Sequence, residues 1–354
     1  TNIAYEFDCI PDEQWESTFP LDYIEQKALD AMELASQIKS GETIDASDML
    51  FLPVRNGWLQ GQYNLVIIDE SQDMSNSQLE IAQGVSIKGG RICLVGDDRQ
   101  AIYGFRGADS GSLDRLKREL GAAELGLTRT YRCAKSIVRL AAELVPDFEA
   151  GEFNPEGEIL NIFSHELIET AGPGNFILSR VNAPLAGIAM KLFRAGKRTQ
   201  IAGRDIGKGL VILVRKLRGT SIPDFLRKTE AWETRETYRL QTLLDKAING
   251  RKATLQAKME AIHDSAEMMI SLAEGAKSIT EITDRIENLF TDDGLGTTGM
   301  ITCSSIHRAK GLESDKVFIL EDTLRSHSIE EINLRYVAIS RSKTSLVWVS
   351  EKSK

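Results

Sequence analysis

The stretch Leu65-Val66-Ile67-Ile68-Asp69-Glu70 indicates the fold class of this chain. Its consecutive apolar residues are typical of a buried strand, and its two carboxylates follow where that strand ends. The run Ile92–Val95 repeats the pattern one strand later and is followed by Gly96-Asp97-Asp98. Because such strands alternate with helical segments, the sequence predicts an α/β fold with a parallel sheet and crossover helices.

Bulk composition limits the class of protein before any motif is considered. The 354 residues suffice for two domains of ordinary size and a small third, and 42% hydrophobic content supports real cores. No run of 18 apolar residues occurs and Thr1–Cys9 lacks the pattern of a signal peptide, so we expect a cytoplasmic protein without membrane contact. The 4 cysteines form no C-x-x-C pair, which disfavours zinc and redox sites. The net charge of −9 still permits a local basic groove.

Several stretches of the chain differ in sequence pattern. By pattern, the chain divides into residues 1–50, 51–150, 151–215 together with 294–354, and 216–293. The first stretch is helical around Asp22–Lys39, the next two alternate strands with helices, and the last is almost wholly helical. We therefore predict an α/β domain interrupted by a helical insert. The elements expected in that domain are strands at Ile159–Phe163, Phe176–Leu178, Met300–Cys303, Val317–Leu320 and Leu346–Val349, and a helix at Ala183–Ala195.

Polar side chains follow both strands of the 51–150 stretch, at the sheet edge where α/β folds bind ligands. In nucleotide-driven motors an Asp at this edge helps to hold Mg²⁺, and a Glu orients or deprotonates the attacking water. Asp69 and Glu70 suit these roles, although the same pair is equally compatible with a strand that simply meets a polar loop. Gln100 follows the second strand, where its amide could hydrogen-bond a γ-phosphate or the water.

Two aromatic residues, Tyr103 and Phe105, flank Gly104 on an apparent loop. Exposed aromatic rings beside Gly and Arg suit stacking on unpaired bases. Ordinary packing beneath the loop is the alternative, and it is the commoner fate of aromatic residues.

Six segments follow one another along the chain: Asp69-Glu-Ser-Gln-Asp73, Gly96–Asp109, Thr130-Tyr131-Arg132, Phe176–Ala183, Ile301–Glu313 and Glu331–Arg341. In this order they resemble motifs II, III and IV, a nucleotide-facing segment, and motifs V and VI of UvrD/Rep-type superfamily 1 DNA helicases. Asp45–Pro53 resembles the lead-in to motif II. The resemblance covers about residues 45–215 and 296–350.

The resemblance implies a role for each matching residue at the phosphate end of ATP. Asp69 would coordinate Mg²⁺, Glu70 would be the catalytic base, and Gln100 would sense the γ-phosphate. Arg132 and Arg341 would be arginine fingers, which stabilise charge in the transition state.

The resemblance also implies contacts with the rest of the nucleotide and with DNA. Tyr131 would stack on the adenine, and Glu313 would bind the ribose. The residues that would face single-stranded DNA are Tyr103, Phe105, Ser305 and His307. The remaining histidines, at 165, 263 and 327, lack such context and are expected at the surface.

By this resemblance the chain would contain two RecA-like parallel-sheet motor domains, the first incomplete, with a helical insert in the second. Residues 1–50 would be a helical remnant of an accessory subdomain, and 216–293 a reduced accessory subdomain. ATP would bind in the cleft between the motor domains and drive 3′-to-5′ movement along single-stranded DNA towards duplex junctions. The alternative is a helicase remnant that binds DNA or a partner without hydrolysing ATP.

One departure from the family concerns the phosphate-binding loop. The sequence contains no G-x-x-x-x-G-K-[ST] segment. The nearest similarity, Gly203–Gly209, is one residue short, and we interpret Gly207-Lys208 as a loop before a helix at Leu210–Leu217. We therefore expect a chain truncated before motif II, inactive alone, with the apolar faces of its first two strands uncovered.

Overall fold

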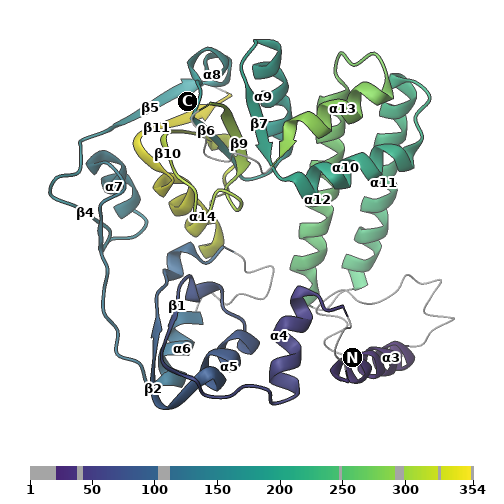
Figure 1. Ribbon diagram of the computed structural model, residues 1–354. Coiled ribbons are helices and arrows are strands. Elements are labelled where there is room, and N and C mark those ends of the chain that lie inside the picture. The colour runs from purple at the N-terminus through teal and green to yellow at the C-terminus, as the bar shows by residue number, and fades with distance from the viewer. Residues whose placement is uncertain are drawn as a thin grey trace. The chain divides into compact units, whose positions relative to one another are not determined.

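The computed structural model describes residues 21–37, 43–102, 112–246, 249–291, 299–325 and 328–351. The chain forms two compact units, whose elements are labelled in Figure 1. Unit 1 comprises residues 1–123 and 244–256, and unit 2 comprises residues 124–243 and 257–354. The domain limits expected from sequence stay a prediction. In the described part of the chain, no helix combines the length and apolar character needed to cross a bilayer.

Unit 1 holds a two-stranded parallel sheet in which β1 (Tyr63–Ile68) pairs with β2 (Ser86–Leu94). Each strand is closely followed by a 3-10 turn, η1 (Ser71–Asp73) or η2 (Asp98–Gln100). Because the strands are parallel, both polar segments lie at the same edge of the sheet. The described helices that lie wholly in unit 1 are α3 (Leu21–Ser36), α4 (Ala46–Arg55), α5 (Asn76–Val85) and α6 (Ser112–Leu120).

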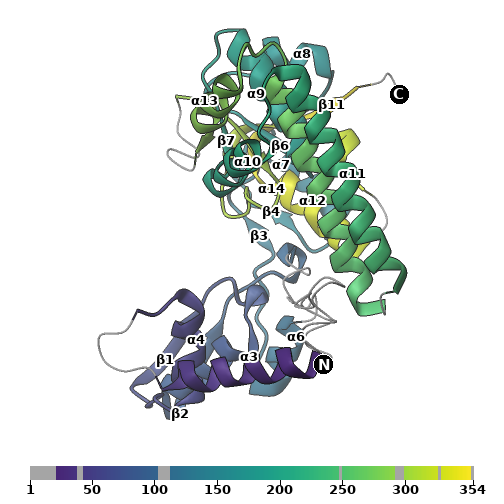
Figure 2. The ribbon, with the colours of Figure 1, turned by 90° about the vertical axis from the view of Figure 1, so that its right-hand side faces the viewer.

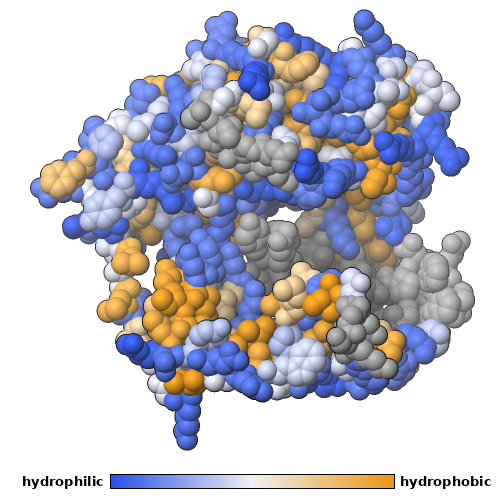
Figure 3. Space-filling view, in the orientation of Figure 1, coloured by the Kyte–Doolittle hydropathy of each residue, from blue (hydrophilic) through white to orange (hydrophobic). Residues whose placement is uncertain are grey.

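Among the described residues, the sheet of unit 1 is covered on one face only. One set of alternating side chains packs against buried apolar residues of α5 and α6. The other set includes Leu65 and Ile67, whose exposed fractions are 45% and 65%. The prediction that Leu65–Ile68 and Ile92–Val95 form buried strands is therefore wrong for this face, because a parallel sheet hides both faces only when helices cover both. Figure 3 shows hydrophobic surface over this part of unit 1.

Unit 2 is built on a seven-stranded sheet of order β5-β11-β10-β6-β9-β7-β8, in which every pairing is parallel. Its strands are β5 (Glu158–Phe163), β6 (Phe176–Ser179), β7 (Thr199–Ala202), β8 (Phe290–Thr291), β9 (Ile301–Ser305), β10 (Ser314–Leu320) and β11 (Ser342–Ser350). The expected α/β fold class of RecA-like parallel-sheet type is confirmed. A separate short pair joins β3 (Arg129–Thr130) to β4 (Glu149–Ala150), also in parallel.

The centre of the unit 2 sheet is buried between helices. Every residue of β6, β7 and β9 is buried, as strands covered on both faces require. The helices around the sheet are α7 (Lys135–Ala142), α8 (Ser164–Thr170), α9 (Ala183–Arg194), α10 (Arg204–Leu217) and α14 (Ile329–Ser340).

A helical segment separates β7 from β8. It contains α11 (Ile222–Lys246) and α12 (Asn249–Ala273), which run side by side in Figure 2, and α13 (Ile279–Leu289). Asp264 of α12 accepts hydrogen bonds from the backbone amides of Asn182 and Ala183 at 3.0 and 2.5 Å, where α9 begins. This carboxylate satisfies amides that the helix itself leaves unpaired.

The structure corrects the interpretation of Gly207-Lys208 as a loop. α10 begins at Arg204, after Gly203 with its φ of +135°, so both residues lie inside the helix. A Cβ on Gly207 would lie 2.5 Å from the Cβ of Phe290. Gly207 is therefore required for close packing of α10 on β8, a role that its sequence neighbours do not indicate.

Candidate functional site

The carboxylate pair of motif II lies directly after β1. Glu70 adopts φ +51° and ψ 38°, the left-handed region that residues other than glycine rarely occupy. Its backbone amide donates to Oδ1 of Asp69 at 2.9 Å. A strained backbone of this kind persists only where the surrounding structure enforces it, and such positions cluster at functional sites.

A chain of hydrogen bonds joins this pair to the turn after β2. Gln72 donates from Nε2 to Oε2 of Glu70 at 2.6 Å, and its Oε1 accepts the amide of Asp97 at 3.1 Å. Gln100 donates to Oδ2 of Asp97 at 2.9 Å. The predicted base and the predicted γ-phosphate sensor are thus connected through a buried glutamine.

Sequence reasoning missed Gln72, although it stands inside the quoted motif II. The position of Gln72, two residues after Glu70 within motif II, is the sequence feature that could have indicated its role. Gly96 supports the same contact, because a Cβ there would lie 2.6 Å from Oε1 of Gln72.

The acidic edge of unit 1 is open enough to receive a ligand. Asp69 and Glu70 are exposed, and with Asp73 they line a cavity of about 440 Å³ whose other walls are mainly apolar residues of β1 and α5. Within the described ranges, no cluster of three His, Cys, Asp or Glu side chains could hold a metal. Mg²⁺ does not need one, since one or two carboxylates, waters and substrate phosphates usually bind it. The exposed pair therefore fits Mg²⁺ that arrives with a nucleotide.

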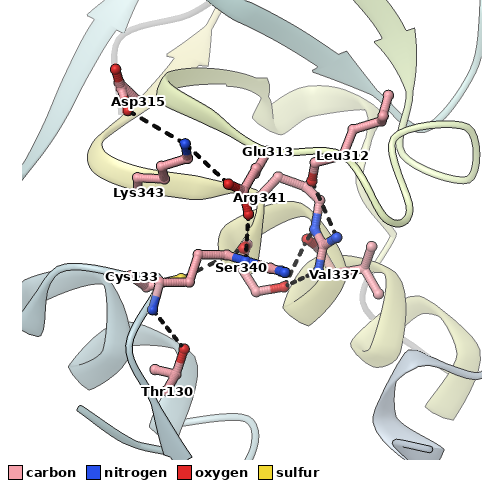
Figure 4. Close-up of polar contacts among 10 residues, drawn as sticks. Thr130, Cys133, Leu312, Glu313, Asp315, Val337, Ser340, Arg341 and Lys343 are labelled. Carbon is pink, nitrogen blue, oxygen red and sulfur yellow. Dashed lines mark hydrogen bonds and ion pairs between the residues drawn. The ribbon is translucent and has the colours of Figure 1, made fainter. Parts of the chain in front are cut away.

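In unit 2 a second group of predicted residues gathers around Glu313. Arg132 Nε lies 2.7 Å from Glu313 Oε2, and Lys343 Nζ lies 3.0 Å from Glu313 Oε1 (Figure 4). Lys343 also lies 3.9 Å from Asp315. The hydrogen bond from Lys343, followed by the charge of Arg132, holds the pKa of Glu313 below its usual value. Lys343 was not among the predicted site residues.

Arg341 is brought to the same group but is almost completely buried, with 1% of its surface exposed. Its guanidinium donates to the carbonyl oxygens of Val337 and Leu312 at 3.0 and 3.2 Å and to Oγ of Ser340 at 2.9 Å (Figure 4). Contact with a phosphate would require this side chain to leave those partners. The neighbouring Cys133 is also buried, which raises its pKa to about 11.

Tyr131 stands in the turn between β3 and α7, next to Arg132. The residue is 76% exposed. An exposed ring next to Arg132 is compatible with its predicted stacking on adenine.

The predicted DNA-facing residues are only partly described. Ser305 ends β9 and is buried, and His307 lies in the following turn. The next residue, Arg308, pairs with Asp205 in the first turn of α10. Tyr103 and Phe105 lie outside the described residues, so their role stays a prediction.

The fold and these two groups of side chains are typical of nucleotide-dependent motor proteins: a parallel sheet with acidic strand ends in one unit, and guanidinium and carboxylate groups in the other. The family model described as the UvrD/REP helicase N-terminal domain matches residues 16–121, and that of the UvrD-like helicase C-terminal domain matches residues 300–349. Over these two segments the chain is therefore similar to UvrD/Rep-type helicases.

Individual relatives agree with this family. The chain is 35% identical to DNA helicase II of Rickettsia typhi over 89 residues, 25% of this chain and 14% of the relative. It is 27% identical to the ATP-dependent DNA helicase PcrA of Staphylococcus aureus over 130 residues, 34% of this chain and 18% of the relative. It is 37% identical to the ATP-dependent DNA helicase srs2 of Schizosaccharomyces pombe over 81 residues, 23% of this chain and 9% of the relative. The matched segments thus span less than a fifth of each relative.

Proposed function

We propose that this chain is the ATP-dependent motor part of a DNA helicase that moves 3′ to 5′ along single-stranded DNA. The observation that carries the proposal is the hydrogen-bonded connection from Glu70 through Gln72 and Asp97 to Gln100. A base and a phosphate sensor that share one network can respond together to the γ-phosphate. The names of the relatives, each a DNA helicase, support the same function.

Four residues of the predicted motifs take part in hydrolysis. Glu70 accepts the proton of the attacking water, and Gln100 orients that water or the γ-phosphate. Arg132 and Arg341 stabilise the negative charge that develops in the transition state. Mg²⁺ bound at Asp69 would neutralise phosphate charge when the nucleotide is present.

The remaining residues bind the parts of the substrates that do not react. Tyr131 stacks on adenine, and Glu313 accepts hydrogen bonds from the ribose hydroxyls. Single-stranded DNA and its junctions with duplex are the proposed substrates. The proposed contacts with unpaired strands come from Tyr103, Phe105, Ser305 and His307.

Phosphate release is the direct test. We expect the 354-residue chain to hydrolyse little ATP even with saturating single-stranded DNA, since no P-loop sequence is present to hold the β- and γ-phosphates. Fusion to a strand–P-loop–helix segment from a relative should produce DNA-stimulated turnover, and Glu70→Gln should remove it. Robust turnover by the unfused chain would reveal a phosphate cradle elsewhere. A folded fusion without turnover would favour the non-catalytic alternative.

That alternative, a DNA- or partner-binding protein without ATPase, has one observation in its favour. The apolar face that contains Leu65 and Ile67 is exposed in unit 1, and such faces often bind another polypeptide. Equal affinity of the fusion for single-stranded DNA with and without ATP, together with absent turnover, would support it.

A further inference from the structure

The turn that carries Tyr131 and Arg132 is tied at both ends by one buried side chain. Asn154, 8% exposed, donates from Nδ2 to the carbonyl oxygen of Thr130 at 2.9 Å and to that of Cys133 at 2.7 Å. These two carbonyls immediately flank the Tyr131-Arg132 pair. A single amide group therefore fixes the span from which both side chains project.

The backbone after β4 strengthens the same arrangement. The amide of Gly151 donates to the carbonyl oxygen of Thr130 at 2.9 Å, and the amide of Asn154 donates to that of Gly151 at 3.1 Å. The short loop from 151 to 154 is thus bonded both to the turn and within itself. Its geometry follows that of the turn.

Gly151 supports the ring of Tyr131 directly. A Cβ on Gly151 would lie 2.7 Å from Cδ1 and 2.8 Å from Cε1 of that ring, and 2.7 Å from Oδ1 of Asn154. The φ of Gly151 does not lie in the left-handed region, so the backbone alone does not demand glycine. The Tyr131 ring and the Asn154 amide together leave no space for a side chain at this position.

We infer that Asn154 and Gly151 are positioning residues that seat Tyr131 for stacking on a purine base. The inference rests on the proposed function, in which Tyr131 binds adenine. Tyr131 meets the protein at Gly151 while 76% of its side chain stays open to a ligand. A ring held in its bound orientation loses less conformational freedom when the base arrives, and the binding is correspondingly tighter.

We call the arrangement in which Asn154 and Gly151 position the Tyr131 ring the seat. It can be tested without any ligand by NMR of the 354-residue chain labelled at glycine Cα. An aromatic ring so close to Gly151 shifts the Hα resonances of that glycine, and Tyr131→Ala identifies them by removing the shift. Asn154→Ala should abolish most of the shift, whereas Asn175→Ala, which removes a side-chain bond to Gly172 elsewhere in unit 2, should not. A ring-current shift that persists in Asn154→Ala would overturn the inference.

Ligand binding then tests the purpose of the seat. Calorimetric titration with ATP and with inorganic triphosphate separates base contacts from phosphate contacts. Stacking on an aromatic ring corresponds to roughly 5- to 100-fold in affinity, and Asn154→Ala should lose about 5-fold for ATP with no change for triphosphate. Gly151→Ala would place a Cβ against both the Tyr131 ring and Oδ1 of Asn154, so it should also weaken ATP binding. It should have no further effect in a Tyr131→Ala background.

The outcomes separate the inference from the proposed function. If Tyr131→Ala does not weaken ATP binding, adenine stacking is wrong and the seat has lost its purpose. If Tyr131→Ala weakens ATP binding while Asn154→Ala and Gly151→Ala leave it unchanged, stacking stands and the seat alone is refuted.

Discussion

Arg132 and Glu313 form an ion pair, with 2.7 Å between Nε and Oε2, although they come from different motifs far apart in the sequence. The first is the predicted arginine finger of motif IV, and the second is the predicted ribose ligand of motif V. The ion pair joins these two predicted site residues.

Arg132 should be needed for hydrolysis more than for nucleotide binding. In the P-loop fusion, Arg132→Ala should lower kcat on the order of 10³-fold, because the guanidinium stabilises charge that develops only in the transition state. Arg132→Lys should restore little, since an ammonium lacks the planar fork. Steady-state phosphate release measures both, and a kcat within a few-fold of the parent would refute the assignment.

Substitution of Arg341 should affect both kcat and stability, since Arg341 is buried among carbonyl oxygens. Arg341→Ala should lower kcat as Arg132→Ala does, and it should also lower the free energy of unfolding by about 1–3 kcal/mol, because buried acceptors lose their donor. Urea unfolding of the 354-residue chain measures the second effect. If Arg341→Ala lowers the free energy of unfolding but leaves kcat within a few-fold of the parent, Arg341 is a structural residue and not an arginine finger.

Glu70→Gln in the fusion should nearly abolish turnover and leave ATP and DNA binding intact. The amide cannot accept the proton of water, whereas its oxygen can still accept the hydrogen bond from Gln72. Phosphate release compared with filter binding of labelled ATP separates the two effects. Substantial residual DNA-stimulated ATPase would exclude Glu70 as the base.

The left-handed backbone of Glu70 predicts a difference between two substitutions that both remove its carboxylate. Glu70→Gly should be more stable than Glu70→Ala by about 1 kcal/mol, because only glycine adopts positive φ without strain. Urea unfolding of both variants isolates the backbone effect from the lost side-chain contact. Equal stability would show that the turn relaxes.

His263 should make stability depend on pH in unit 2. Its Nδ1 lies 2.6 Å from Oε1 of Glu233, and this hydrogen bond raises its pKa. A pKa raised by folding contributes stability that is full below the unfolded value of about 6.5 and is lost as pH rises through the folded value. His263→Ala should therefore destabilise the chain at pH 5.5 by less than about 1 kcal/mol, since the pair is exposed, and hardly at pH 9. Glu233→Gln should reduce the same pH dependence, with the part due to Glu267 remaining. An effect of His263→Ala that is equal at both pH values would contradict the prediction.

Local sequence determined the elements and the chemistry of the site. Apolar runs at Leu65–Ile68 and Phe176–Leu178 form strands because their apolar and β-branched residue types favour extended backbone locally. The identity and order of Asp69-Glu70, Tyr131-Arg132 and Glu313 were sufficient to indicate the family. Such features need no knowledge of what lies opposite them.

The contacts that hold those groups in place depend on the tertiary structure. Gln72 reaches Asp97 across 25 residues, and Gly207 packs on Phe290 through a contact that no local pattern records. Arg341 likewise donates to the carbonyl oxygen of Leu312, which lies in the connection between β9 and β10. Close packing and buried hydrogen bonds join pairs of residues that are distant in the chain. A single sequence therefore indicates which residues matter but not which residues they contact.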